Sequence, residues 1–348
     1  MICSDLHTAL ASLLAQYNRN QVAVLLDSNV PFDSSFPTLC IESDEAHKSI
    51  ETVCRIWDFL LEQKITRRGV LVCIGGGVLT DIGGFAAATY KRGIDSIHIP
   101  TTLLAMTDAS SGGKTGFNHG GLKNVIGCFA LPVETLIWPG WLKTLPVRQV
   151  LSGFGEMLKT GLIEANTGDR AQGTDRLWNR LLQYDLEVMD IDQLTPLIAE
   201  CVAVKERIVT ADPKEEGLRK TLNFGHTFGH ALEEMSILSS TGPDLHPIPH
   251  GYAVVYGMIA ELYLSVTHLG CPKEPLQQLT QLMLRYYGRP DCKCSDRTRL
   301  AVLMQQDKKN EHVSEINCTL LQSVGEPVIN QVVTQEEANE ALEYLFSL

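Results

Sequence analysis

GVLVCIGGGVLTDIGGF, residues 69–85, joins an unbroken apolar run to three consecutive glycines. The run at residues 69–74 predicts a strand that is buried on both faces of a parallel sheet. The glycines let the backbone approach a phosphate closely, with the amide hydrogens of a helix N-terminus facing it. Because the spacing is not G-x-G-x-x-G, the segment indicates either a nucleotide-binding turn or a tight strand-to-helix turn without a ligand.

The neighbouring residues extend this pattern into a doubly wound α/β domain over residues 1–150. Residues 22–26, 38–41 and 97–100 are further short apolar runs, and residues 49–63 carry apolar side chains at helical spacing. Asp27 follows the first of these strands, where acids of dinucleotide-binding folds accept ribose hydroxyls. The same residue would equally cap a helix. Together the features favour NAD as the cofactor.

Residues 151–348 predict a second domain that is mostly α-helical. Apolar residues keep helical spacing through residues 202–209, 222–235 and 254–269, and strand-like runs are few. Residues 165–174 and 236–249 have the composition of surface loops.

The composition predicts a cytoplasmic protein with neither a nucleic-acid nor a membrane partner. The 348 residues have a formal net charge of −12, whereas nucleic-acid-binding domains usually carry a basic face. We find no signal-peptide pattern at the start and no apolar run near the ~20 residues that cross a bilayer. The ten cysteines are scattered as reduced thiols would be. The one close pair, Cys292 and Cys294, predicts a plain loop.

One glutamate and three histidines predict a catalytic metal site in the second domain. His226 and His230 lie four residues apart, so on a helix they share a face that a metal or an anion can use. His250 opens the next predicted helix, and Glu156 lies one turn from Lys159 in an otherwise apolar helix. A Glu/His/His set leaves a metal position open for substrate, which suits catalysis. Zinc is expected first, and cobalt fits the same ligands; the spacing leaves both His226 and His230 open as ligands.

Basic and amide side chains gather in glycine-rich turns and near the histidine helix. The set is Arg92, Lys114, Lys123, Asn124, Lys205 and Arg219. Taken singly, each predicts a solvated surface charge. Taken together, they predict pockets for a phosphate and a carboxylate. The negative net charge does not exclude such local anion sites.

Several long motifs in one order resemble the 3-dehydroquinate synthase family of sugar-phosphate cyclases. They are GGGVLTDIGGFAAATYKRG, PTTLLAMTDASSGGKTGFN, LKNVIG, GEMLK, EEGLRKTLNFGHTFGH and HGYAV, and the likeness runs over residues 27–309. The resemblance implies an NAD-binding α/β domain over residues 1–150, a helical metal- and substrate-binding domain over residues 151–348, and a homodimer.

The resemblance also implies a role for individual residues. The metal ligands would be Glu156, His226 and His250. The NAD contacts would be Asp27, Asn29, Glu45, Lys48, Gly76, Gly77, Asp81, Thr101, Thr102, Asp108, Lys114 and Lys123. The substrate contacts would be Asp108, Lys114, Asn124, Lys159, Lys205, Arg219, Asn223 and His230, with Arg92 reaching the phosphate across the dimer interface. One of Lys308 and Lys309 would also contact substrate.

The implied reaction converts 3-deoxy-D-arabino-heptulosonate 7-phosphate into 3-dehydroquinate and phosphate in the shikimate pathway. NAD oxidises the sugar transiently, phosphate is eliminated, the hydride returns, and the ring opens and closes again by an aldol step. Two features depart from the family: Tyr252 stands where many members have glutamate or glutamine, and the segment 236–249 is longer than usual. Another sugar-phosphate cyclase, a metal-dependent polyol dehydrogenase and a catalytically dead binding protein are the alternatives.

Overall fold

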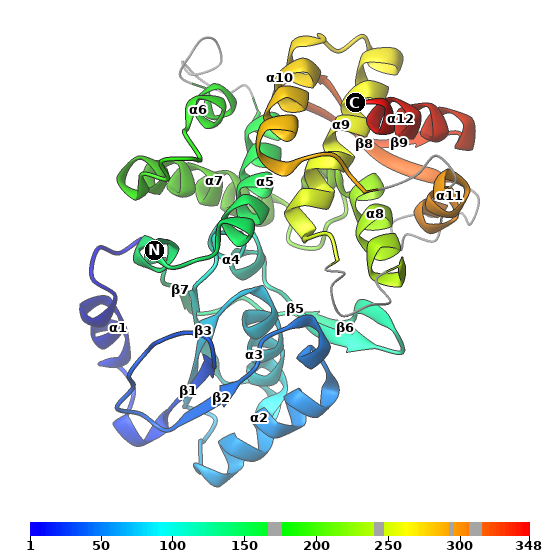
Figure 1. Ribbon diagram of the computed structural model, residues 1–348. Helices are drawn as coiled ribbons and strands as arrows, with labels where there is room; N and C mark the ends of the chain where they lie inside the picture. Colours follow the sequence, from blue (N-terminus) through cyan, green and yellow to red (C-terminus); the bar gives the residue numbers. More distant parts are fainter. Residues whose placement is uncertain (166–175, 240–246, 292–295, 306–314) are drawn as a thin grey trace. The chain divides into compact units, whose positions relative to one another are not determined.

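The computed structural model describes residues 1–165, 176–239, 247–291, 296–305 and 315–348 (Figure 1). They form two compact units, Met1–Pro146 and Val147–Leu348. Several predictions fall wholly or partly outside the described residues: the loops at 165–174 and 236–249, the pair Cys292 and Cys294, and Lys308 and Lys309. No helix in the described part of the chain is long and apolar enough to cross a membrane.

Met1–Pro146 is built around a parallel sheet. Its elements are α1 (Leu6–Leu14), β1 (Val22–Asp27), β2 (Thr38–Ile41), α2 (Ile50–Glu62), β3 (Val70–Gly75), α3 (Gly77–Thr89), β4 (Asp95–Pro100), α4 (Leu103–Thr107), β5 (Lys114–His119), β6 (Leu122–Phe129) and β7 (Glu134–Thr135). The four predicted strands correspond to β1, β2, β3 and β4, and the predicted helix at 49–63 corresponds to α2. The prediction of an α/β fold is confirmed.

The strand order reverses between β1 and β3. The order is β2-β1-β3-β4-β7, and each pair of neighbours is parallel. The chain runs outward from β1 to β2 on one side and from β3 to β4 and β7 on the other. The order therefore reverses between β1 and β3, and doubly wound folds bind ligands beyond the carboxyl ends of the strands at such a point.

The helix α3 lies very close to this sheet because glycines face it. A Cβ on Gly83 would lie 2.5 Å from the Sγ of Cys73 in β3, and a Cβ on Gly84 would lie 3.3 Å from the ring of His98 in β4. The apolar side chains of α2, α3, β1 and β3 form one buried cluster. This packing fixes the N-terminus of α3 directly beyond the end of β3.

Val147–Leu348 is mostly helical, as predicted. Its elements are α5 (Val147–Ile163), α6 (Leu177–Gln183), α7 (Ile191–Ala211), the 3₁₀-helix η6 (Leu218–Asn223), α8 (His226–Ser239), α9 (His250–Leu269), α10 (Glu274–Leu282), the π-helical turn η7 (Met283–Tyr287), α11 (Arg297–Gln305), β8 (Ile316–Ser323), β9 (Glu326–Val333) and α12 (Gln335–Ser347). The helix α9 packs against α5, α8, β8 and α12 (Figure 1).

One sequence-based expectation about an element was wrong, and two hairpins were not predicted. The helix expected from Leu222 begins at His226, because η6 ends at Asn223 and Gly225 has φ +80°. The antiparallel hairpins β5–β6 and β8–β9 were not predicted. In β5–β6 the turn is made by Gly120 and Gly121, both at positive φ, and β6 is mostly exposed, so its pattern lacks the apolar alternation of a half-buried strand.

Candidate active site

The helix α5 carries a buried carboxylate and a buried amine on one face. Glu156 and Lys159 are 1% and 2% exposed, and the Nζ of Lys159 lies 2.5 Å from Oε2 of Glu156. Every residue from Val150 to Ile163 is buried. A lone charge in such an apolar helix would be costly, so each of the two groups needs the other or a further ion.

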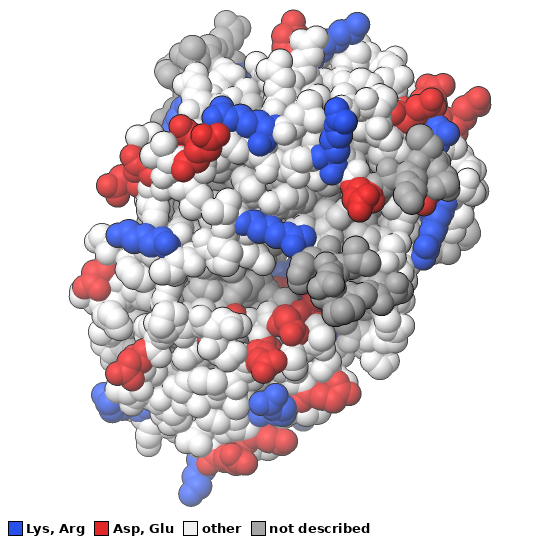
Figure 2. All heavy atoms as spheres, in the orientation of Figure 1, with Lys and Arg blue, Asp and Glu red and all other residues white. Residues whose placement is uncertain are grey.

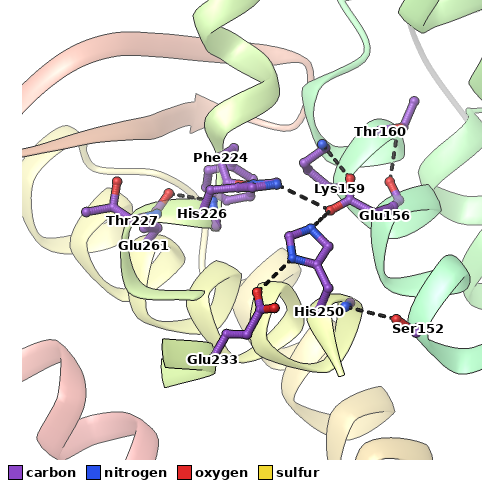
Figure 3. Close-up of polar contacts among 12 residues, drawn as sticks. Ser152, Glu156, Lys159, Thr160, Phe224, His226, Thr227, Glu233, His250 and Glu261 are labelled. Atoms are coloured by element: carbon purple, nitrogen blue, oxygen red, sulfur yellow. Dashed lines mark hydrogen bonds and ion pairs between the residues drawn. The ribbon is translucent and has the colours of Figure 1, made fainter. Parts of the chain in front are cut away.

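Two histidines from the first residues of two helices approach Glu156 from the other side. His226 begins α8 and His250 begins α9. The Nε2 atoms of both lie 3.4 Å from Oε1 of Glu156 (Figure 3). Each of these three residues has a ligand atom within 4.8 Å of those of the other two. The structure thus brings together the three residues predicted as metal ligands.

The spacing of these atoms fits one tetrahedral metal ion. Nitrogen and oxygen ligands lie about 2.0–2.1 Å from zinc, so two ligands of one tetrahedral ion are about 3.3 Å apart. The two measured Nε2–Oε1 separations of 3.4 Å match this value. They are too long for strong hydrogen bonds. The residues present therefore fit a divalent cation, and three protein ligands leave one position open.

The electrostatic balance of the site favours a cation. Burial lowers the pKa of His226 to about 3, with the positive charge of Lys159 adding to the effect. Burial also opposes a charge on His250, but its contacts with Glu156 and Glu233 outweigh this and raise its pKa to about 10. For Glu156, burial is outweighed by Lys159 and His226, which hold the pKa of the carboxyl well below its usual range. The two carboxylates therefore favour positive charge at His250, which a bound metal ion would supply in place of the proton.

His230 lies beside the metal ligands and is not one of the three. Its ring centroid lies 5.2 Å from that of His226 and 5.9 Å from that of His250. The group of ligand atoms found among the described residues contains His226 and His250 only, besides Glu156. The choice between His226 and His230, which spacing left open, therefore favours His226.

Buried basic residues of the same unit come from α7 and η6. Lys205 is 6% exposed and Arg219 is 2% exposed. The guanidinium of Arg219 donates from Nη1 to the carbonyl of Pro213, and the amide of Asn223 donates to Oε1 of Glu215 over 3.0 Å. On the face shown in Figure 2, by contrast, Lys and Arg lie among Asp and Glu without forming a broad basic field. Lys205 and Arg219 thus place positive charge inside this unit, away from the exposed charges.

The predicted nucleotide-binding turn lies at the strand-order reversal of the other unit. Gly76 is the N-cap of α3 and, having no side chain, provides no cap for the first N–H groups of the helix. A Cβ on Gly77 would lie 3.1 Å from Ala109, so this turn accommodates backbone alone. The N–H of Thr101 donates to the carbonyl of Gly75. The ends of β3 and β4 therefore meet at the helix N-terminus, where a phosphate is stabilised.

Asp27 lies at the other side of this reversal, at the end of β1. Its Oδ1 accepts from the backbone N–H of Asn29 over 2.9 Å and from the amide of Asn29 over 3.2 Å. The hydroxyl of Ser43 donates to its Oδ2. The carboxylate is thus oriented by its own turn, and its place at the end of β1 suits a ribose hydroxyl.

The hairpin β5–β6 links other predicted contact residues through Asn118. The side-chain amide of Asn118 donates to Oε1 of Glu45 over 2.7 Å, and its Oδ1 accepts from the N–H of Asn124. Its backbone N–H donates to the carbonyl of Lys48, whose Nζ lies 2.5 Å from Asp81. Residues distant in sequence are therefore held in one network of this unit.

The remaining predicted residues lie on turns and edges of the same unit. Lys114 begins β5, Lys123 lies in β6, and both are exposed. Asp108 and Thr102 cap the ends of α4. Arg92 lies in a turn in which Lys91, Arg92 and Gly93 all have positive φ. Such backbone is unfavourable for side chains other than glycine and is often retained at functional sites.

Met1–Pro146 also contains a cavity of about 480 Å³ with an aromatic lining. Phe32, Trp138 and Trp141 line it together with His7, whose ring stacks on Phe32 at 5.5 Å. Asp33 adds an acid. None of the predicted contact residues lines this cavity, although its loop at Pro31 follows β1 closely in the chain.

Three residues of these networks were missed by the sequence reading. Asn118 joins the contacts described above. Glu233 accepts from Nδ1 of His250, and Glu261 accepts from the N–H groups of Gly225 and Thr227 just before and within α8. For Glu233 a signal existed: with His226 and His230 it follows the i, i+4, i+7 spacing of one helix face.

Comparisons with known proteins agree across both units. The family model for the N-terminal domain of 3-dehydroquinate synthase matches residues 38–152, and that for the C-terminal domain matches residues 153–310. A 3-dehydroquinate synthase of Parabacteroides distasonis is 41% identical over 355 residues, covering 99% of this chain and 96% of that protein. A 3-dehydroquinate synthase of Alkaliphilus oremlandii is 39% identical over 80% of this chain and 72% of that protein.

Solved structures resemble the chain over its whole length. The 2-epi-5-epi-valiolone synthase of Streptomyces hygroscopicus, with NAD+ and Zn2+ bound, superposes with a TM-score of 0.81 at 28% identity, covering 100% of this chain and 96% of that one. A 2-deoxy-scyllo-inosose synthase complexed with carbaglucose-6-phosphate, NAD+ and Co2+ gives a TM-score of 0.79 at 24% identity, covering 96% and 94%. The second likeness shows the fold alone.

Proposed function

We infer the reaction of this protein from its family: the chain belongs to the 3-dehydroquinate synthases. The protein converts 3-deoxy-D-arabino-heptulosonate 7-phosphate into 3-dehydroquinate and phosphate. Because phosphate leaves by elimination, the enzyme is a carbon–oxygen lyase. The observation that carries the proposal is the buried triad of Glu156, His226 and His250 with the ligand spacing of one metal ion, next to Lys159.

The two units divide the work. Residues 1–150 bind NAD, with phosphates at the N-terminus of α3 and ribose hydroxyls at Asp27 and Asn29. The aromatic cavity at Phe32 and Trp141 suits the planar adenine ring. Residues 151–348 hold zinc or cobalt and the substrate. When bound, NAD supplies reversible hydride transfer and the metal ion supplies a Lewis acid for the hydroxyl oxygen that is oxidised.

The residues of the chain bind and orient the substrate around that chemistry. Lys159 and Asp108 hold hydroxyl groups next to the oxidised carbon. Lys205 and Arg219 bind the carboxylate, with Asn223 oriented by Glu215 beside them. Lys114, Asn124 and His230 bind the phosphate. Once the sugar carries a ketone, the neighbouring C–H is acidic and phosphate can leave, its own oxygens serving as the base. Much of the rate enhancement then comes from positioning.

A homodimer completes the phosphate site in this proposal. Arg92 of a second copy contacts the phosphate, and the positive φ of Lys91 and Arg92 supports a turn retained for function. We also propose a cytoplasmic location, supported by cysteines that are free wherever the structure describes them.

A comparison of two substrates tests this assignment. The protein is incubated with NAD, Zn²⁺ and either the heptulosonate phosphate or the same sugar phosphate lacking the carboxylate, and the carbocyclic product is identified by NMR. Formation of 3-dehydroquinate from the first, with at most slow turnover of the second, is expected, because Lys205 and Arg219 are proposed to bind the carboxylate. Faster turnover of the sugar without a carboxylate would assign the chain to another cyclase reaction.

A further inference from the structure

His250 is held through both of its ring nitrogens. Its Nε2 lies 3.4 Å from Oε1 of Glu156, on the metal side, and its Nδ1 lies 3.0 Å from Oε2 of Glu233 (Figure 3). An imidazole binds a metal ion through one nitrogen only, and the hydrogen bond made by the other decides which tautomer is present and how the ring is turned. The contact with Glu233 therefore sets the tautomer and the ring orientation of His250.

Glu233 lies on the same helix as His226. Glu233 lies on α8, seven residues after His226, so one helix supplies both a metal ligand and the acid that holds the ligand of α9. Its side chain is 14% exposed. The next residue, Glu234, is exposed on the same helix. Two adjacent glutamates of one charge therefore have different environments, and only Glu233 contacts the metal triad.

The two histidine ligands are held by acceptors of different charge. Nδ1 of His226 lies 3.1 Å from the backbone carbonyl of Phe224, which is neutral, whereas Nδ1 of His250 faces a carboxylate. A carboxylate partner makes an imidazole a stronger donor to a cation and adds negative charge near it. We propose that Glu233 is a positioning residue for the metal, which fixes Nε2 of His250 toward the ion and strengthens that bond.

Metal binding by four variants tests the proposal without any turnover. Glu233→Ala and Glu233→Gln are compared with Glu234→Ala and Glu234→Gln, which make the same chemical change on the same helix. The affinity for Co²⁺ is measured by competition with a chelator, and the visible absorption spectrum of the Co²⁺ form reports the ligand field. The proposal rests on the metal site of the proposed function, but these readouts use no sugar phosphate.

Glu233→Ala is expected to weaken Co²⁺ binding about 10- to 100-fold and to shift the cobalt spectrum. Glu233→Gln is expected to lie between Glu233→Ala and the wild type, because the amide oxygen still accepts from Nδ1 but carries no charge. The Glu234 variants are expected to bind as the wild type does. If Glu233→Ala fails to fold, the nearly isosteric Glu233→Gln decides.

Wild-type cobalt affinity and spectrum in the Glu233 variants would overturn the proposal, and would do so even if their melting temperature fell, since that outcome means a purely structural contact. If the Glu233 variants bind cobalt more weakly but the wild type forms no 3-dehydroquinate, the inference stands and the proposed reaction is removed. The two failures are therefore distinguishable.

Discussion

Lys159 places a buried amine beside the carboxylate of Glu156. Its side chain is 2% exposed, and its Nζ lies 2.5 Å from Oε2 of Glu156, a predicted metal ligand. We predict that Lys159→Ala keeps its zinc, because all three ligands remain, but lowers turnover by about 10²-fold or more, because a preorganised charge next to the reacting oxygen is lost. Zinc content by metal analysis and kcat for phosphate release check this.

The matched control for this variant is Lys273→Ala, which removes an exposed lysine of the same unit. It is expected to keep both zinc and turnover. Normal turnover in Lys159→Ala would remove Lys159 from the proposed chemistry, and loss of zinc would make its role one of holding Glu156.

The buried ring of His98 makes the stability of the protein depend on pH. Burial in β4 lowers the pKa of its ring from 6.5 to about 4. The unfolded chain therefore binds a proton at His98 more readily than the folded one. The stability linked to this residue is fully present above pH 6.5 and is lost as the pH falls toward 4, by up to about 3 kcal/mol.

We expect the melting temperature of the wild type to fall more between pH 7.5 and 5 than that of His98→Leu, which cannot titrate at this position. The other titratable groups are the same in both proteins, so the difference between them isolates His98. Parallel curves would mean that the ring is protonated as easily in the folded state as in the unfolded chain.

The sequence predicted a set of metal ligands more narrowly than spacing alone could. Spacing left His226 and His230 open, and only the surrounding motifs favoured His226, which the geometry supports. Glu233 was missed because two adjacent glutamates on a polar helix face are ordinary. The i, i+4, i+7 spacing with His226 and His230 favours Glu233 over Glu234, but its contact with His250 depends on how α9 packs on α8.

Close contacts between helices set the positions of the ligands. A Cβ on Gly251 of α9 would overlap the carbonyl of Ser152 in α5, and a Cβ on Gly155 would overlap the carbonyl of Gly251. A Cβ on Gly229 of α8 would lie 3.0 Å from the carbonyl of Ala253. The backbones of α5, α8 and α9 thus touch next to Glu156, His226 and His250.

Alanine substitutions at these glycines are predicted to form a graded series. Gly251→Ala should destabilise most, Gly155→Ala less and Gly229→Ala least, because overpacking costs about 1–3 kcal/mol or more and grows with the overlap. In Gly229→Ala the gain in helix propensity of about 1 kcal/mol offsets part of the cost. Melting temperature and zinc content are expected to be lowest in Gly251→Ala, higher in Gly155→Ala and highest in Gly229→Ala. Equal effects at the three sites would contradict the proposed packing.

The elements that the sequence predicted well are those with a strong local signal. The apolar runs became β1, β2, β3 and β4, and the amphipathic segment became α2. The start of α8 was placed four residues early because residues 222–225 carry helical spacing, and the positive φ of Gly225 that ends this pattern is a tertiary feature. Gly225 packs against Met258 and Val254 of α9. The hairpin β5–β6 was missed because β6 is mostly exposed and lacks the apolar alternation of a half-buried strand.

The proposed reaction draws on both units of the chain. Met1–Pro146 has the strand-order reversal and helix N-terminus at which doubly wound folds bind ligands, and Val147–Leu348 contains the predicted metal ligands. The central claim is that NAD is reduced and reoxidised within one turnover, so that it acts as a catalyst. A polyol dehydrogenase with the same cofactor and metal would instead release NADH with each product molecule.

Phosphate release from the heptulosonate phosphate, followed together with the absorbance of NADH and with and without a chelator, tests this claim most directly. We expect steady phosphate release without net NADH, loss of this release when the metal is removed, and its return when Zn²⁺ or Co²⁺ is added. NADH that accumulates in proportion to product, or phosphate release that persists after the metal is removed, would contradict it.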